Sequence, residues 1–170
     1  MTAPQAGDFA VVSAGGLAGR LVAWGERLNG TGFSEYQHAF IYIGGGQVVQ
    51  AEPAGACVRP LTGHARELWS TGIIPLTGPQ RTAIVNAAHR YAAAKVDYSF
   101  LDYLALAAHR FRLPIPGLRW WIRRTRHMIC SQLTDRCYAD AGVHLFKNVW
   151  EGYVTPADLA QLLEARRAAI

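Results

Sequence analysis

The chain has 170 residues, of which 51% are hydrophobic and 17% are charged. This length and balance fit one globular domain with its own core, and they exclude an intrinsically disordered chain. The formal net charge of +5 favours an anionic partner such as cell-wall polymer, acidic lipid or nucleic acid, and charge alone does not choose among them.

The sequence shows no membrane-spanning segment, no signal-peptide pattern and no linker between domains. No apolar run approaches the roughly 20 residues that a membrane-spanning helix needs, and the first residues show no basic segment followed by a long apolar one. We therefore expect no signal peptide and synthesis in the cytoplasm; any extracellular role would need release by lysis or carriage on a larger particle such as a phage. No repeat or linker interrupts the chain, so we expect a single domain over residues 1–170.

The first third of the chain predicts a strand, a helix and a hairpin. Phe9–Val12 is a short apolar run typical of a buried strand, and residues 15–30 carry apolar side chains at helical spacing. His38–Ile43 and Gln47–Glu52 are β-rich segments on either side of Gly44-Gly45-Gly46. Three glycines between two such segments predict a hairpin.

Further short strands and four helices complete the pattern. The strands are expected at Val58–Leu61 and Gly72–Leu76, and the helices at residues 79–95, 99–111, 130–141 and from 156 onward. The third of these helices stops at Gly142, and the last has Thr155 as N-cap and Pro156 in its first position. The class is therefore α+β, with helices packed on a small antiparallel sheet.

Cys130 is the strongest candidate for a reactive side chain. It stands at the predicted start of a helix, where backbone N–H groups and the helix dipole stabilise a thiolate. The alternative is a small core residue, which is the interpretation we give to Cys57 and Cys137. Three cysteines at this spacing form neither a disulfide framework nor a zinc site.

His38 begins the first strand of the hairpin, a rigid element that can aim an imidazole into a cleft. On the return strand, Gln50 and Glu52 share one face, and the hairpin places that strand beside His38. One of the two could accept the imidazole N–H and so set its tautomer, which completes a nucleophile, base and orienter. A structural histidine and two polar strand residues are the alternative.

The order of these pieces resembles the circularly permuted branch of the NlpC-type papain-like superfamily, which includes YiiX-like hydrolases and lecithin–retinol acyltransferase-like enzymes. The segments that carry the resemblance are GDFAVV, QHAFIYIGGGQVVQAEPAGACVRPL, VDYSFLDYL, ICSQLTDRCYADAGV and VTPADLAQ. The permuted branch has its histidine hairpin before its cysteine helix. The resemblance thus implies a permuted papain-like fold, with the nucleophile at a helix N-terminus.

The resemblance also implies a role for individual residues. Cys130 matches the nucleophile, His38 the base, and Gln50 the third polar position, where many relatives have glutamate or histidine. Glu52 is the alternative orienter if the hairpin register differs by two, and Tyr98 matches a tyrosine that lines the cleft. No metal or organic cofactor is implied.

The expected activity is that of a cysteine hydrolase acting through an acyl-enzyme, with cell-wall peptide amides (peptidoglycan) as the first substrate class. Lipid ester hydrolysis or acyl transfer is the alternative, and it depends on a possible anionic-membrane contact through Arg119, Trp120, Trp121, Arg123 and Arg124. The other interpretation of that segment is a loop whose tryptophans cover the core. We expect no nucleic-acid partner, and a non-catalytic binding or structural module of a phage or secretion assembly stays open.

Overall fold

A computed structural model of the protein describes residues 3–13, 35–52, 55–94, 130–146 and 154–170. The strands in these ranges are β1 (Phe9–Val12), β2 (His38–Gly44), β3 (Gln47–Glu52), β4 (Gly55–Pro60) and β5 (Glu67–Trp69). The helices are α2 (Gly78–Ala93), α5 (Cys130–Asp140) and α6 (Pro156–Ala168).

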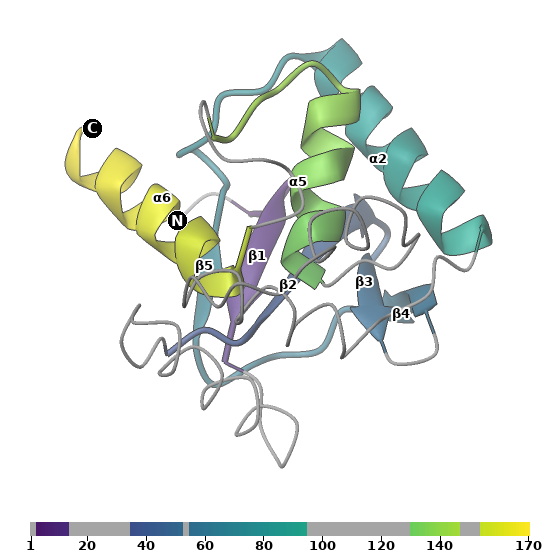
Figure 1. Ribbon diagram of the computed structural model, residues 1–170, viewed down its shortest axis with the longest axis horizontal. Helices are drawn as coiled ribbons and strands as arrows, with labels where there is room; N and C mark the ends of the chain where they lie inside the picture. Colours follow the sequence, from purple (N-terminus) through teal and green to yellow (C-terminus); the bar gives the residue numbers. More distant parts are fainter. Residues whose placement is uncertain (1–2, 14–34, 53–54, 95–129, 147–153) are drawn as a thin grey trace, which may run out of the picture.

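The strands form one antiparallel sheet in the order β4-β3-β2-β1-β5. Helices α2 and α5 lie side by side and pack on β2 and β3, while α6 packs against β1 and β5 (Figure 1). The predicted α+β class, with helices on a small antiparallel sheet, is confirmed.

The β2–β3 hairpin follows the predicted pattern. Gly44, Gly45 and Gly46 all have positive φ, at 93°, 59° and 71°, a backbone conformation that costs glycine little. Ile41 pairs with Val49, and both are fully buried in the core under the helices. Because side chains alternate along a strand, the even-numbered residues of both strands share the opposite face.

One predicted strand is wrong. Residues 71–73 form a turn and residues 74–77 join no strand, because Gly72 has a φ of 73° and the N–H groups of Ile73 and Ile74 both donate to the carbonyl oxygen of Ser70 at 2.9 Å. Ile74 is 2% exposed, so the apolar run fills the core without joining the sheet. The strand of this region is β5, whose three residues are too few for a clear alternating pattern.

The other predicted elements are found where the structure describes them. β4 begins at Gly55, three residues before the predicted start, and α2 and α5 match their predicted spans closely. α6 begins as expected after Thr155, whose side chain and that of Asp158 form a reciprocal capping box. The helices predicted at 15–30 and 99–111 lie outside the described residues.

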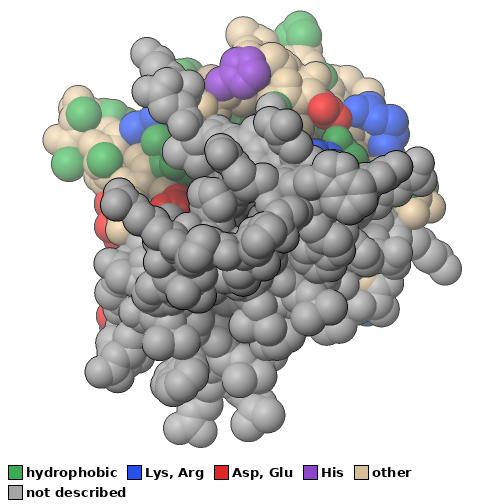
Figure 2. Space-filling model, in the orientation of Figure 1, with side chains coloured by type: hydrophobic (Ala, Val, Ile, Leu, Met, Phe, Trp, Pro, Cys, Tyr) green, Lys and Arg blue, Asp and Glu red, His purple; other side chains and the backbone are tan. Residues whose placement is uncertain are grey.

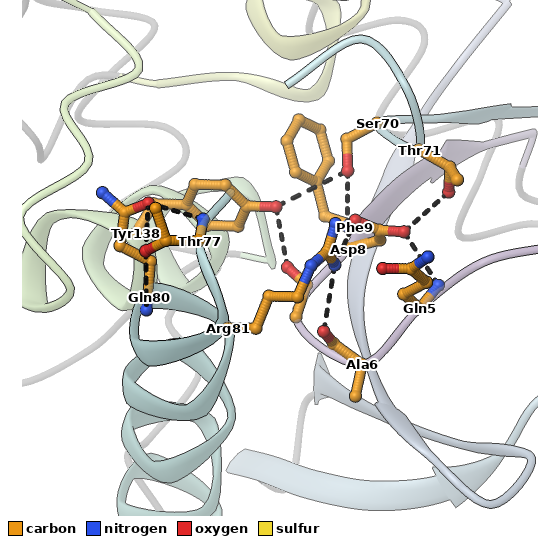
Figure 3. Close-up of polar contacts among 11 residues, drawn as sticks. Gln5, Ala6, Asp8, Phe9, Ser70, Thr71, Thr77, Gln80, Arg81 and Tyr138 are labelled. Carbon is orange, nitrogen blue, oxygen red and sulfur yellow. Dashed lines mark hydrogen bonds and ion pairs between the residues drawn. The ribbon is translucent and has the colours of Figure 1, made fainter. Parts of the chain in front are cut away.

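A buried carboxylate ties β1 to α2 (Figure 3). Asp8 is fully buried, and it accepts hydrogen bonds from Arg81 Nη1, Thr71 Oγ1 and the backbone N–H of Gln5, each at 2.8 Å. Gly7 has a φ of 92°, and a Cβ there would lie 3.1 Å from the Arg81 Cα atom. Only glycine therefore lets β1 approach α2 this closely.

The same region anchors α5 to the start of β1. The Tyr138 hydroxyl donates to the carbonyl oxygen of Gly7 at 2.8 Å, and the Tyr138 ring meets that of Phe9 edge to face, with centroids 5.3 Å apart. Tyr138 is fully buried and lies two helical turns beyond Cys130. These contacts therefore set the position of the helix that carries the cysteine.

Among the described residues, no helix combines the length and the apolar character needed to cross a membrane. On the described part of the face in Figure 2, basic side chains lie beside acidic ones, and no large basic patch is visible there.

Removal of the buried carboxylate is expected to destabilise the fold strongly. In Asp8→Ala the Arg81 guanidinium loses its partner in a mostly buried position, so the free energy of unfolding should fall by about 3–5 kcal/mol. Tyr138→Phe leaves the Gly7 carbonyl oxygen unpaired, and the expected loss is about 1–2 kcal/mol. Urea unfolding monitored by circular dichroism measures both.

Asp140→Asn is the matched control, because it breaks an exposed pair with Arg90 at 3.0 Å, and such pairs contribute about 0–1 kcal/mol. If Asp8→Ala unfolded at the same urea concentration as Asp140→Asn, the buried ion pair would not be a structural anchor.

Candidate active site

Cys130 lies where α5 meets the sheet. It opens α5 as the structure describes that helix, and its spacing to Leu133 and Cys137 places all three on the buried side. Cys130 is 6% exposed, and its sulfur accepts hydrogen bonds from the backbone N–H groups of Ala39 and Ser131. These donors favour the thiolate over the thiol.

His38 is the first residue of β2, and its imidazole hydrogen-bonds the Cys130 sulfur. Burial alone would lower the pKa of His38, but the charge and hydrogen bond of Cys130, helped by Gln50, raise that pKa from 6.5 to about 9. Burial by itself raises the pKa of the Cys130 thiol, and the His38 charge and hydrogen bonds outweigh this and lower it. The two shifts together favour a thiolate–imidazolium pair.

Gln50 supplies the second hydrogen bond of the imidazole. Its side-chain oxygen lies 2.9 Å from His38 Nε2. An amide oxygen only accepts, so Nε2 carries the proton in this contact, and Nδ1 is the ring nitrogen left for the sulfur. The residue that bonds the imidazole is thus Gln50, as the resemblance implies.

Glu52 reaches the imidazole only through its charge, which contributes to the raised pKa of His38. Its carboxylate oxygen Oε1 accepts from the Gln50 amide nitrogen at 2.8 Å. The alternative role of Glu52, as the direct orienter of His38, is therefore not the arrangement that the structure has.

Arg59 of β4 holds the other end of this chain of contacts. Its Nε donates to Glu52 Oε1 at 2.8 Å and its Nη2 to Glu52 Oε2 at 2.6 Å. The Cys57 thiol also hydrogen-bonds Glu52. The pKa of Glu52 is lowered from 4.5 to about 2, and the hydrogen bond from Arg59 is the largest cause.

A cavity of about 380 Å³ adjoins the imidazole. His38 and Gln50 line it, together with Glu52, Arg59 and His64. Its apolar lining comes from the smaller buried cluster on the other face of the sheet and from the end of β4 with the residue after it: Val12, Phe40, Val48, Pro60 and Leu61. His38 thus contacts the Cys130 sulfur and also lines this cavity, whereas Cys130 is not among the described residues that line it.

The structure brings Cys130, His38 and Gln50 into one hydrogen-bonded chain. Of the two orienters that the hairpin left open, Gln50 is the one in contact with the imidazole. Tyr98 and the segment Arg119–Arg124 lie outside the described residues. The prediction that Cys57 is a core residue is wrong, because the thiol is partly exposed beside Glu52. It lies opposite Gln50 on β4, a strand at the edge of the sheet.

Arg59 is the member of the site that the sequence reasoning missed. The signal was present, since Arg59 lies two residues after Cys57 and so shares its face of β4. Only the β3–β4 register, which pairs Gln50 with Cys57 and Val48 with Arg59, shows that this face continues that of Glu52.

Within the described ranges, no group of three or more histidine, cysteine or acidic side chains is placed to hold a metal ion. Comparisons with protein-family models, with curated proteins and with solved structures gave no match.

The coupling of the two groups predicts the titration of His38. Its imidazole should titrate near pH 9 in the wild-type protein. In Cys130→Ala the thiolate charge is gone and burial dominates, so the pKa of His38 should fall well below that value. Histidine NMR across pH measures both, and an unchanged pKa in Cys130→Ala would contradict the contact.

Proposed function

We propose that the protein is a thiol-dependent hydrolase of the permuted papain-like type, in which Cys130 is the nucleophile, His38 the acid and base, and Gln50 the orienter of His38. The observation that carries the proposal is the chain of hydrogen bonds from Cys130 through His38 to Gln50. A thiol of lowered pKa, a paired imidazole and a third oriented group are the parts that nucleophilic catalysis by cysteine needs.

The reaction follows from the charges of the resting pair. The Cys130 thiolate attacks a carbonyl carbon, and the oxyanion of the tetrahedral intermediate is stabilised by the backbone N–H of Cys130 at the helix N-terminus. The His38 imidazolium then donates its proton to the leaving group, and an acyl-enzyme remains. Neutral His38 takes a proton from water, which attacks the thioester and releases the acid and the free thiolate.

Peptide amides of the cell wall are the proposed substrates. The net charge of +5 suits an anionic polymer, and the cavity beside His38 offers charged and polar groups such as Arg59 and His64. An acyl ester of a lipid is the second candidate, which the apolar part of the same cavity favours through Phe40, Val48 and Leu61.

Substitution of the three residues tests the chemistry. Cys130→Ala should abolish hydrolysis, because no other group forms the acyl-enzyme, and His38→Ala should lower kcat by about a hundredfold or more. Gln50→Ala should cause a smaller loss, since it removes only the orienter. The assays are release of new amino groups from purified peptidoglycan, and release of fatty acid from a phospholipid panel.

If only the hydrolysis of peptidoglycan depends on Cys130, the protein is an amidase. If only the hydrolysis of phospholipid depends on Cys130, it is a lipid hydrolase. Hydrolysis that survived Cys130→Ala would contradict the proposal. So would inactivity of the wild-type protein on both substrates together with a Cys130 thiol of ordinary pKa, and that result would favour a binding or structural module.

The pH dependence of kcat/KM should be bell-shaped. Above about pH 9 His38 loses the proton that the leaving group needs, so the rate should fall on the alkaline side. On the acidic side the rate should fall only below the lowered pKa of Cys130, where the thiolate is protonated. The ordinary pKa of a thiol is about 8.5. An acidic limb near that pH would contradict the ion pair.

A further inference from the structure

Gln50 can orient His38 correctly in only one of its two amide orientations. With its oxygen toward Nε2, the amide accepts the Nε2 proton, and Nδ1 of a neutral imidazole is bare. With its NH₂ group toward Nε2, the amide would favour the opposite tautomer. That tautomer carries a proton on Nδ1, the nitrogen facing Cys130, and cannot take a proton from the thiol.

Glutamine by itself does not choose between these orientations, because its oxygen and its NH₂ group have similar shapes. Glu52 makes the choice. A carboxylate only accepts hydrogen bonds, so the amide group 2.8 Å from Glu52 Oε1 must be the NH₂ group. The oxygen of Gln50 is then the atom that faces His38 Nε2 at 2.9 Å.

Arg59 keeps Glu52 in place for this task. Its guanidinium binds both carboxylate oxygens, a two-point contact that fixes the plane of the carboxylate as well as its position. Arg59 lies opposite Val48 in the β3–β4 register, whereas Glu52 lies opposite Gly55. The arginine therefore extends along the sheet past Cys57, and its planar fork meets both carboxylate oxygens, which a lysine ammonium would not do in the same geometry.

The exposure of the Arg59–Glu52 pair limits what it contributes to stability. The Arg59 side chain is 52% exposed and that of Glu52 26%, so solvent screens their attraction and the fold gains little from it. The contact of Glu52 with the Gln50 amide, in contrast, leads directly into the buried part of the site.

We propose that Glu52 and Arg59 are positioning residues, which hold the Gln50 amide in the orientation that leaves His38 Nδ1 able to accept the Cys130 proton. This inference rests on the proposed function and adds two residues to it, neither of which touches the reacting atoms. The order of action runs from Arg59 through Glu52 and Gln50 to His38.

The test is the pH profile of Cys130 alkylation by iodoacetamide, resolved by peptide mass spectrometry so that Cys57 and Cys137 are counted separately. In Glu52→Ala the amide is free to turn, the imidazolium loses support, and the Cys130 profile should shift to higher pH. A shift of one pH unit lowers the rate by about tenfold at pH values below the pKa of Cys130 in both proteins. Arg59→Met should shift the profile in the same direction but less, because Glu52 still contacts Gln50.

The second measurement is the tautomer of His38, read from ring-nitrogen NMR shifts in a Cys130→Ala background. With Glu52 present the proton should lie on Nε2, and with Glu52→Ala added a share of the Nδ1–H form should appear. Neither alkylation nor the tautomer should respond to Asp140→Asn, which breaks an arginine–carboxylate pair of similar exposure elsewhere on the surface.

The outcomes separate this inference from the proposed function. If wild-type Cys130 has a lowered pKa and Glu52→Ala leaves both its profile and the His38 tautomer unchanged, the positioning role is overturned and the hydrolase stands. If wild-type Cys130 titrates as an ordinary thiol, both proposals fall. A shift in Asp140→Asn equal to that in Glu52→Ala would also overturn the positioning role.

Discussion

The position of α5 relative to β1 is the constraint on which the candidate site depends. Tyr138 joins the helix to the Gly7 carbonyl oxygen, and Asp8 in the next position is bound by Arg81 of α2. The first contact is buried and the second is largely so, and contacts shielded from solvent hold their geometry more firmly than surface contacts do. β1 pairs with β2, and the anchor of α5 on β1 therefore also sets the distance between the Cys130 sulfur and the His38 ring.

The polar chain of the site runs from a buried end to an exposed one. Cys130 is 6% exposed, and a thiolate at this position needs a cation and N–H donors close by because little water reaches it. At the other end, Arg59 is half exposed, and it costs little to keep charged there. The charged groups are thus linked by hydrogen bonds from an exposed end, where water stabilises the charge of Arg59, to a buried end, where neighbouring protein groups must stabilise any charge on Cys130.

The sequence predicted elements where local chemistry decides the structure. The three glycines between β2 and β3 and the helix start with Thr155 as N-cap and Pro156 after it are such cases, because turn and cap preferences act over a few residues. It failed at residues 72–76, where an apolar run with the composition of a strand instead fills the core next to a turn at Gly72. The prediction that Cys57 is a core residue was wrong for a related reason, since burial depends on which strand lies at the sheet edge.

The sequence by itself singled out Cys130 and His38 and narrowed the third position to Gln50 or Glu52, because residue type, place in an element and strand alternation are local properties. The resemblance to the permuted papain-like branch favoured Gln50. Only the tertiary structure decided that the helix carrying the sulfur reaches the start of β2. It also decided that Glu52 hydrogen-bonds Gln50, and that Gln50 is the residue that hydrogen-bonds the imidazole. The physical reason is that such contacts depend on helix packing and on the β3–β4 register. Both are set by the whole core, and neither is encoded by any short stretch of residues.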